Sequence, residues 1–313
     1  MIMNNVKLSI IIPVRNAENS IERCINSLLN QTVKDGYEII VVDNNSKDRT
    51  RMILEKFDNI KIIQNNNQGS YSSRNLGITI AQGELLFFTD SDCIAQNDLI
   101  EKIFECDQNY KFDIIQGQSL HNYTKNEVSD MIQFRYNDIF FTDILVNHPF
   151  CSRIDTRNCI INKKIFEQFG GFDDECILWG DLDFGYKLVE SGYQIFYNNK
   201  IVIYHENIQE LNEYISKIIK EGNNAFIYLR RKGKTFAYNY FKELLFIFTI
   251  KLRFDEIELT KEVLLLKNEL ESQIAYFHNS DISKKYLVFK KISEIAFKIG
   301  VLEAAKKEYY HKD

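Results

Sequence analysis

Short apolar runs alternate with amphipathic segments through the first 110 residues, and this alternation restricts the possible folds more than any other feature of the chain. Residues 8–13 include three consecutive isoleucines, and residues 38–43 and 85–89 form similar runs. Uninterrupted apolar runs of this length are typical of strands buried on both faces of a sheet. Residues 21–29 instead carry apolar side chains at helical spacing. Strands that alternate with short helices predict an α/β fold with a mainly parallel sheet and right-handed crossovers.

The alternation continues to about residue 205, with a looser pattern between residues 112 and 158. Gly83 is expected to end one of the helices as its C-cap. Further strands are predicted at residues 60–64, 113–117, 158–162 and 194–204, and helices at residues 49–57, 72–81, 99–106, 163–169 and 181–190.

Long helical patterns follow residue 206 and predict a C-terminal helical region. These patterns cover residues 211–228, 259–277 and 284–309. Because one domain of roughly 200 residues leaves little chain for a second core, we expect an α/β domain over residues 1–207 and a helical appendage over residues 208–313.

Composition excludes several classes of function. The net charge of −5 gives no whole-protein attraction to nucleic acid, so no nucleic-acid partner is expected. The six cysteines form no C-x-x-C pair and have no zinc spacing, and no signal peptide is apparent; these features predict reduced thiols and a cytoplasmic protein. No apolar stretch approaches the ~20 residues that span a bilayer. The nearest, residues 244–250, favours a buried helix over a membrane-surface segment.

Two carboxylates two residues apart follow the apolar run at residues 85–89. A strand that ends in alternate acids projects them where the backbone leaves the sheet, so Asp90 and Asp92 can hold Mg²⁺ or Mn²⁺ with positions left for phosphate oxygens. Ligands of such sheets bind beyond the carboxyl ends of the strands, where Pro13 and Asp43 also lie. The pattern suggests an enzyme that handles a diphosphate, and a turn capped by the acids is the structural alternative.

Other motifs accompany the acid pair in order along the chain. They are SIIIPVRN at residues 9–16, VDNNSKDRT at 42–50, RNLG at 74–77 followed by AQGE at 81–84, and GGFDD at 170–174 followed by WGDLD at 179–183. With these motifs the chain resembles the inverting family 2 glycosyltransferases of the GT-A fold over residues 6–207. The resemblance implies a Rossmann-like mixed, mainly parallel sheet flanked by helices. It also implies a nucleotide-sugar-binding half over about residues 1–118 and an acceptor-binding half over residues 119–207.

On the donor side, the resemblance implies that the first loops and the acid pair bind a nucleotide-sugar. Asp43 would accept hydrogen bonds from the base or ribose, or would serve as a helix N-terminal acid. Arg74 would contact a phosphate or hold the acids in place. A Mn²⁺ or Mg²⁺ ion would be held by Asp90, Asp92 and His205, although a structural role suits the lone histidine equally well. The donor-binding residues would be Pro13, Val14, Arg15, Asn16, Asp43, Arg74, Asp90 and Ser91.

On the acceptor side, the resemblance gives Asp181 the position of the catalytic base. Inversion needs a carboxylate that removes a proton from the attacking hydroxyl, and an N-cap of the following helix is the structural alternative. Trp179 and Gly180 would contact the acceptor, with Trp179 either stacked on a sugar or packed in the core. The chain departs from the family here, because Gly180 replaces the first acid of the usual Glu-Asp pair.

The run RRKGK at residues 230–234 interrupts the C-terminal helices. It would close over a diphosphate, meet anionic lipid headgroups or form a solvated loop. Peripheral contact with the inner face of the membrane and the oligomeric state therefore stay open.

These features together predict a metal-dependent, inverting glycosyltransferase. It would move a sugar from a nucleotide-sugar, expected to be UDP-linked, to a hydroxyl of a glycan or lipid-linked glycan in bacterial-type polysaccharide synthesis. An inactive nucleotide-sugar-binding or glycan-binding protein of the same fold is the alternative, but it would be expected to have lost Asp181 or the acid pair. A nucleotidyltransferase would carry a Gly-rich phosphate loop where this chain has PVRN at residues 13–16. Sugar specificity is expected to depend on loops between residues 120 and 157.

Overall fold

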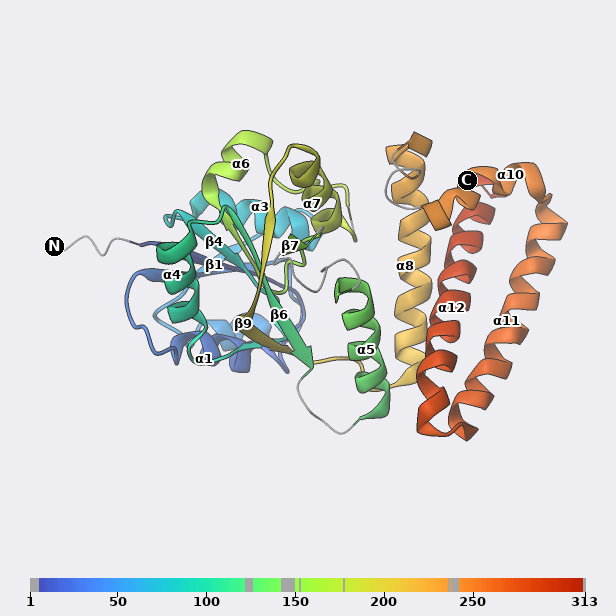
Figure 1. Cartoon of the computed structure of the whole chain (residues 1–313), viewed down its shortest axis with the longest axis horizontal. Helices are drawn as coiled ribbons and strands as arrows, with labels where there is room; N and C mark the ends of the chain where they lie inside the picture. Colours follow the sequence, from blue (N-terminus) through green and yellow to red (C-terminus); the bar gives the residue numbers. More distant parts are fainter. Residues whose placement is uncertain are drawn as a thin grey trace. The chain divides into compact units, whose positions relative to one another are not determined.

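The chain forms two compact units, which are described separately below (Figure 1). One comprises Met1–Tyr123 and Tyr136–Asn207, and the other comprises Thr124–Arg135 and Ile208–Asp313. The expected boundary near residue 207 and the division into donor and acceptor halves stay predictions. The computed structural model describes residues 6–121, 126–141, 150–151, 153–176, 178–235, 237 and 242–311.

A single mixed sheet is the centre of the first unit. β1 pairs in parallel with β2 and β4, and β2 pairs in parallel with β3. β8 runs antiparallel to both β4 and β6, which makes the sheet mixed. The described strands follow the order β3-β2-β1-β4-β8-β6-β9-β5, with β7 paired to β9. They are β1 (Leu8–Val14), β2 (Tyr37–Asp43), β3 (Lys61–Gln64), β4 (Leu85–Phe88), β5 (Cys93–Ala95), β6 (Ile114–His121), β7 (Phe150–Cys151), β8 (Cys159–Asn162) and β9 (Ile195–His205).

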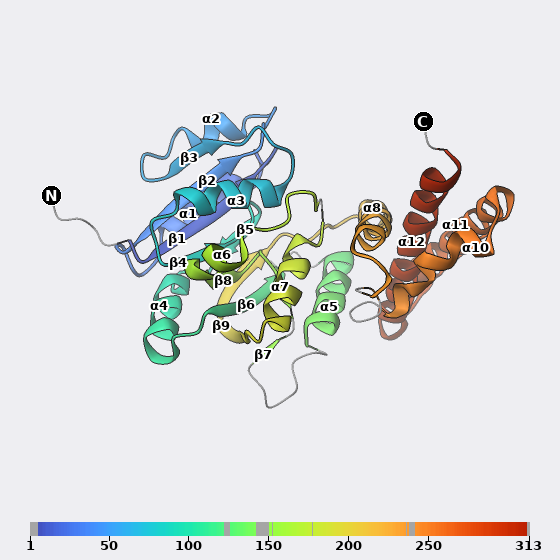
Figure 2. The same ribbon diagram turned by 90° about the horizontal axis from the view of Figure 1, so that it is seen from above.

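Helices cover both faces of this sheet, which confirms the predicted α/β fold class (Figures 1 and 2). Leu8, Ile10 and Ile12 of β1 share one buried core with apolar residues of α1 and α4. Ile11 points to the opposite face, where a Cβ at Gly77 of α3 would lie only 2.6 Å from its Cγ2. Figure 1 shows α6 and α7 above the sheet and α1 below it. The helices of this unit are α1 (Ile21–Leu29), α2 (Thr50–Leu54), α3 (Ser70–Ile80), α4 (Leu99–Tyr110), α6 (Lys163–Phe169) and α7 (Gly180–Glu190). Helix α5 (Glu127–Phe141) begins in the second unit and ends in the first.

Three elements were missing from the sequence prediction. Helix α5 lies in the region where no clear period was found, and β5 and β7 contain only three and two residues. Elements this short carry too few residues to display a period. Much of the specificity region expected between residues 120 and 157 lies outside the described residues, namely 122–125, 142–149 and 152.

Gly83 does not end α3, contrary to the prediction. The helix ends at Ile80, and its C-cap residue, Ala81, has extended backbone. A Cβ at Gly83 would lie 2.7 Å from the backbone nitrogen of Ser9, and the Gly83 N–H donates to Ser9 Oγ at 2.9 Å. Glycine is therefore required because the turn before β4 passes directly against β1, where a side chain would not fit.

The second unit is helical, as predicted. Within the described residues, no helix is both long and apolar enough to cross a membrane. The apolar stretch at residues 244–250 forms most of a 3₁₀-helix rather than an α-helix, with Ile247 and Ile250 buried. Gly233 ends α8 with a φ of 92°, which confirms the predicted break. The helices are α8 (Leu211–Lys232), η1 (Lys242–Thr249), α10 (Ile250–Arg253), α11 (Glu256–Asn279) and α12 (Ile282–Tyr310).

Helices α8 and α12 pack closely through two glycines. A Cβ at Gly222 would overlap the carbonyl oxygen of Phe297, and a Cβ at Gly300 would overlap that of Ile219. Each clash is with backbone, so no change of side-chain rotamer relieves it. The two glycines therefore set how near the two helices can approach.

Replacing Gly300 with alanine is expected to lower the free energy of unfolding by about 2 kcal/mol net, because a Cβ that overlaps backbone puts the overpacking cost at the upper end of about 1–3 kcal/mol. The cost outweighs the gain of about 1 kcal/mol that alanine brings to a helix. Urea denaturation followed by circular dichroism measures the change. Lys307→Ala, on an exposed position of α12, is the control and should change stability by less than about 0.5 kcal/mol. Wild-type stability in Gly300→Ala would contradict the close packing of the two helices.

Candidate active site

The loops after β1 and β2 lie side by side at the carboxyl ends of these strands. Val14 is the register partner of Asp43, and the Asn16 N–H donates to Ser46 Oγ at 3.0 Å. Asp43 is buried, and its Oδ1 accepts a hydrogen bond from the Ser46 N–H at 3.1 Å. The acid therefore fixes its own turn. It does not cap α2, which begins only at Thr50.

The four residues expected to shape the nucleoside pocket divide into two pairs. Pro13 and Val14 are buried in the sheet, and Val14 belongs to the apolar core. Arg15 and Asn16 are exposed beyond the strand, and Asn16 has a left-handed φ of 52°. Of these four residues, only the second pair has side chains that a ligand can reach. The predicted roles of all four stay predictions.

Arg74 of α3 binds the first of the two acids that follow β4. Its buried guanidinium, with 4% of the side chain exposed, donates a hydrogen bond to Asp90 Oδ1. Burial raises the pKa of Asp90, and the positive charge of Arg74 opposes this rise. Of the two roles weighed for Arg74, the structure therefore has it holding the acid. Ser91 lies in the turn between the two acids and is half-buried.

The second acid lies next to His205 because of a strand pairing that the sequence did not reveal. β5 runs antiparallel to the end of β9, with Cys93 opposite His205. As a result, His205 Nε2 lies 3.4 Å from Asp92 Oδ2. Burial alone would raise the pKa of Asp92, but the hydrogen bond and charge of His205 outweigh it and bring the pKa below its usual value.

The donor set at Asp92 and His205 fits a divalent metal. His205 Nδ1 lies 2.9 Å from Oδ1 of Asn207, an oxygen that only accepts, so Nδ1 carries a proton. Nε2 carries a second proton, donated to Asp92, while the imidazole is charged, and in the neutral ring Nε2 would be the nitrogen that binds a metal. Metal-binding histidines usually donate their other N–H to an oxygen in this way. Within the described parts of the chain, no three His, Cys, Asp or Glu side chains gather as a complete ligand set. Mg²⁺ and its relatives commonly take only one or two carboxylates and complete their shell with substrate phosphates.

Asp181 lies in the first turn of α7. The N-cap of this helix is Trp179, so Asp181 is not the cap that the structural alternative proposed. Asp181 Oδ1 accepts hydrogen bonds from the Tyr71 hydroxyl and from the Leu182 N–H, each at 2.9 Å. From the part of the chain that the structure describes, its Oδ2 receives two long contacts of 3.4 Å, from the N–H and hydroxyl of Thr156.

The electrostatic surroundings of Asp181 favour its neutral form. Burial raises the pKa of Asp181, and the nearby negative charge of Asp155 raises it further. The charge of Arg74 and the hydrogen bonds from Tyr71 and Thr156 oppose that rise. A carboxyl whose pKa is raised binds a proton more readily, which suits a group that must accept one.

Tyr71 and Arg74 connect the candidate base to the candidate metal side of the site. They lie one helical turn apart on α3, and the Arg74 guanidinium lies 5.3 Å from the centre of the Tyr71 ring. Tyr71 bonds to Asp181 and Arg74 bonds to Asp90. The structure therefore brings two widely separated acids into one continuous set of contacts.

Trp179 and Gly180 directly precede Asp181 at the start of α7. Trp179 is half-buried and has a left-handed φ of 70°, which is uncommon for a bulky residue. Gly180 is buried against Tyr71, so that a Cβ there would lie 2.8 Å from the ring. Gly180 therefore has no side chain to offer an acceptor.

Three residues of the site were not identified from the sequence. Tyr71 and Thr156 bind Asp181, and Asp155 forms a buried pair with Arg157. Burial would raise the pKa of Asp155, but Arg157 lowers it below its usual value. The only available signal was the position of Tyr71, three residues before Arg74, which is the first residue of the RNLG motif.

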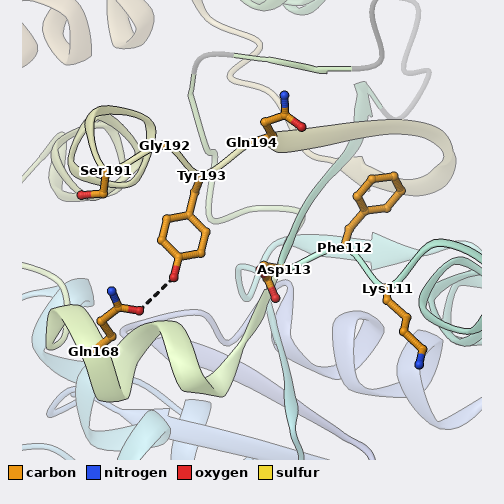
Figure 3. A pocket seen from close by; sticks show the side chains of 8 residues that line it. All are labelled: Lys111, Phe112, Asp113, Gln168, Ser191, Gly192, Tyr193 and Gln194. Carbon is orange, nitrogen blue, oxygen red and sulfur yellow. Dashed lines mark hydrogen bonds between the residues drawn. The ribbon is translucent and has the colours of Figure 1, made fainter.

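A separate depression of about 520 Å³ lies on the first unit, away from these residues (Figure 3). It adjoins the beginnings of β6 and β9, the opposite ends of these strands from His121 and His205. Figure 3 shows the Tyr193 hydroxyl bonded to Gln168 Oε1, at 2.8 Å. None of the residues predicted to form the site lines this depression.

The sequence matches a known family over residues 9–170, described as Glycosyl transferase family 2. Glycosyltransferase AglE of Haloferax volcanii is 30% identical over 206 residues, which cover 63% of this chain and 66% of AglE. The alignments cover 66%, 19% and 30% of three curated relatives, so the chain spans less than two thirds of their lengths.

Two solved structures share the fold. The mannosyltransferase PcManGT from Pyrobaculum calidifontis, in complex with GDP-Man and Mn²⁺, has a TM-score of 0.62 and 18% identity. That comparison covers 98% of this chain and 88% of PcManGT. Residues 1–349 of S. aureus TarS, in complex with UDP, give a TM-score of 0.52 and 16% identity, covering 98% of this chain and 93% of that one. At these identities the likeness concerns the fold alone.

The family match covers more than half of the chain. It includes the loops after β1 and β2, Arg74, the acid pair after β4, and strand β8, which pairs with β4. Together with the mixed sheet flanked by helices, this match leads to one conclusion: the chain belongs to glycosyltransferase family 2.

Proposed function

We propose that this chain is a metal-dependent, inverting glycosyltransferase. It would transfer a sugar from a nucleotide-sugar, UDP-linked in our proposal, to a hydroxyl of a glycan or lipid-linked glycan. The observation that carries the proposal is the set of contacts from Asp181 through Tyr71 and Arg74 to Asp90. It brings a half-buried carboxylate with a raised pKa close to a pair of acids at the end of a parallel strand.

The donor would lie across the carboxyl ends of β1, β2 and β4. Asp43 and the exposed Arg15 and Asn16 would contact the nucleoside, and Asp90 with Ser91 would lie beside the diphosphate. Asp92 and His205 would hold Mn²⁺ or Mg²⁺. Asp90, which Arg74 holds in place, would be a further ligand of the same ion. When bound, the metal supplies positive charge that stabilises the departing nucleoside diphosphate.

The acceptor hydroxyl would approach Asp181 from the side opposite the diphosphate. Its oxygen would form the new bond to the anomeric carbon while the bond from that carbon to the diphosphate oxygen breaks. The electron pair of the broken bond leaves with the nucleoside diphosphate, and the hydroxyl proton passes to the Asp181 carboxylate. One displacement of this kind inverts the configuration at the anomeric carbon. Trp179 would flank the acceptor, whereas Gly180 would contribute backbone only.

A panel of nucleotide-sugars, assayed with Mn²⁺ and a set of glycan and lipid-linked acceptors, tests this function. The expected result is acceptor-dependent release of nucleoside diphosphate, with UDP-sugars as substrates and a product of inverted anomeric configuration by NMR. A retained configuration would contradict the single displacement. Release with GDP-sugars alone would leave the reaction class standing and correct the donor.

The same assay examines membrane contact through residues 230–234. Acceptor presented on vesicles of anionic lipid should be used faster than acceptor on neutral vesicles. The exposed cations of residues 230–234 support this membrane contact. So does Leu252, which is 86% exposed between Lys251 and Arg253. Arg230 itself lies over the rings of Phe248 and Tyr309, at 6.0 and 5.7 Å. Equal rates on both kinds of vesicle would remove this part of the proposal.

A further inference from the structure

The two oxygens of Asp181 are held unequally. Oδ1 has two short hydrogen bonds, from the Tyr71 hydroxyl and the Leu182 N–H, both at 2.9 Å. Among the described residues, Oδ2 has the two 3.4 Å contacts with Thr156 and no shorter one, and these are near the limit of hydrogen bonding. Since the Leu182 N–H belongs to the adjacent residue, Tyr71 is the donor that connects Oδ1 to another element of the fold. Its hydroxyl leaves Oδ2 as the oxygen that is more available to a new proton.

The Tyr71 ring is itself held in one place. It is 6% exposed, the Arg74 guanidinium lies 5.3 Å from its centre, and the Phe172 ring lies 5.6 Å from it. Burial raises the pKa of Tyr71 well above its usual value. The hydroxyl is therefore protonated at neutral pH, where it is a donor to Asp181.

Gly180 provides the space that this ring occupies. A Cβ at residue 180 would lie 2.8 Å from both Cδ2 and Cε2 of Tyr71, which are ring atoms that cannot rotate away. The left-handed backbone at Trp179 leads directly into this contact. Any larger residue at position 180 would push the ring, and with it the hydroxyl, away from Asp181. Gly180, which replaces the first acid of the usual pair, is therefore small enough for the Tyr71 ring that packs against it.

We propose that Tyr71 is a positioning residue for the base Asp181, and that Gly180 is required because it lets the Tyr71 ring reach the base. The inference rests on the proposed function. The hydroxyl of Tyr71 fixes Oδ1, so that Oδ2 faces the acceptor and receives its proton. The charged groups that surround Asp181 are Asp155, which disfavours its ionised form, and Arg74, which favours it. Tyr71 and Thr156 add uncharged donors to the same carboxylate.

Tyr71→Phe tests the hydroxyl while it keeps the ring. We expect kcat to fall about 10- to 100-fold, because a misplaced base loses alignment with the acceptor, and KM for the donor to stay unchanged. A hydrogen bond to a carboxylate favours its ionised form, so its loss should move the acidic limb of the pH profile upward by about one to two pH units. Tyr193→Phe is the matched control, because it removes a hydroxyl from the first unit that bonds to Gln168, away from the site. Kinetics equal to those of the control would overturn the proposal.

The pKa of Asp181 offers a readout that does not depend on transfer. Carboxyl-carbon NMR can follow its titration, with the signal assigned by its absence in Asp181→Asn. The pKa should rise in Tyr71→Phe and stay unchanged in Tyr193→Phe. If no donor supports transfer by the wild-type protein, the proposed function fails while this titration still decides the link between Tyr71 and Asp181. An unchanged pKa in Tyr71→Phe would overturn that link even if transfer is found.

Gly180→Ala tests the matched packing. The added methyl group should lower kcat about as much as Tyr71→Phe does, and the double variant should lose little more, because both changes break the same contact. Additive losses would show that Gly180 acts on something other than Tyr71. Wild-type kinetics in folded Gly180→Ala, with a wild-type thermal transition, would overturn the requirement for glycine.

Discussion

Replacing Asp181 with asparagine is expected to lower the rate of sugar transfer by about 10²- to 10⁴-fold, the usual contribution of a general base. Asparagine keeps the shape of the side chain but takes no proton from the acceptor hydroxyl. Donor binding should be unchanged, since the contacts of Asp181 are with Tyr71, Leu182 and Thr156 and not with the loops after β1 and β2. Steady-state transfer assays and calorimetric titration of the donor measure the two effects separately.

Asp113→Asn is the matched control for this change. Asp113 is a partly exposed acid that pairs with Lys164 and lies beside the depression shown in Figure 3. The control should retain wild-type transfer. Full transfer activity in Asp181→Asn would refute its assignment as base, and joint loss of donor binding and transfer would point to a role on the donor side.

The same carboxylate sets the direction of the pH dependence. Only its ionised form accepts a proton, so transfer must be lost as pH falls through its pKa in the folded protein. Because burial and Asp155 raise the pKa of Asp181, we expect this loss at a pH above the value of about 3.9 that is usual for an exposed aspartate. The loss should be absent from the residual activity of Asp181→Asn.

The sequence predicted the elements that have a long, regular pattern. Strands β1, β2 and β4 are apolar on both faces, and α1 repeats its apolar residues at helical spacing, so their positions could be read directly. Strand β5 could not be found, because three residues after a turn look like any loop. Because β5 was not predicted, the position of His205 beside Asp92 could not be explained from the sequence. The pairing of β5 with β9 is what brings this residue to Asp92.

The residues of the candidate site also divide into those that the sequence pattern could identify and those that it could not. Asp90, Asp92 and Asp181 belong to recognisable motifs: the acid pair suggested metal binding by its position after a strand, and the family resemblance implied the role of Asp181 as base. Tyr71 did not, because its bond to Asp181 joins residues 110 positions apart and depends on how α3 and α7 pack. Gly180 was noticed as a missing acid, but only the structure gives the physical reason, which is the ring that fills the space. Contacts between distant elements are thus what the sequence could not supply.

Removal of divalent metal is expected to lower transfer by about 10²- to 10⁴-fold, because the positive charge on the leaving diphosphate is worth several kcal/mol and each 1.36 kcal/mol changes the rate tenfold. Extensive dialysis against EDTA followed by assay measures the loss, and added Mn²⁺ or Mg²⁺ should restore activity. Asp92→Asn should produce a loss of similar size and raise the metal concentration needed for half-maximal rate.

The control for this change is Asp98→Asn, an acid that pairs with Lys102 on α4 and should leave the metal dependence unchanged. Asp92 is the informative position, because its neighbour Asp90 is already bound by Arg74 and a change there would also free a buried cation. Full activity in thorough chelator would refute a metal-dependent reaction. A metal requirement that is identical in Asp92→Asn and wild type would instead move the metal away from the side of the site formed by Asp92 and His205.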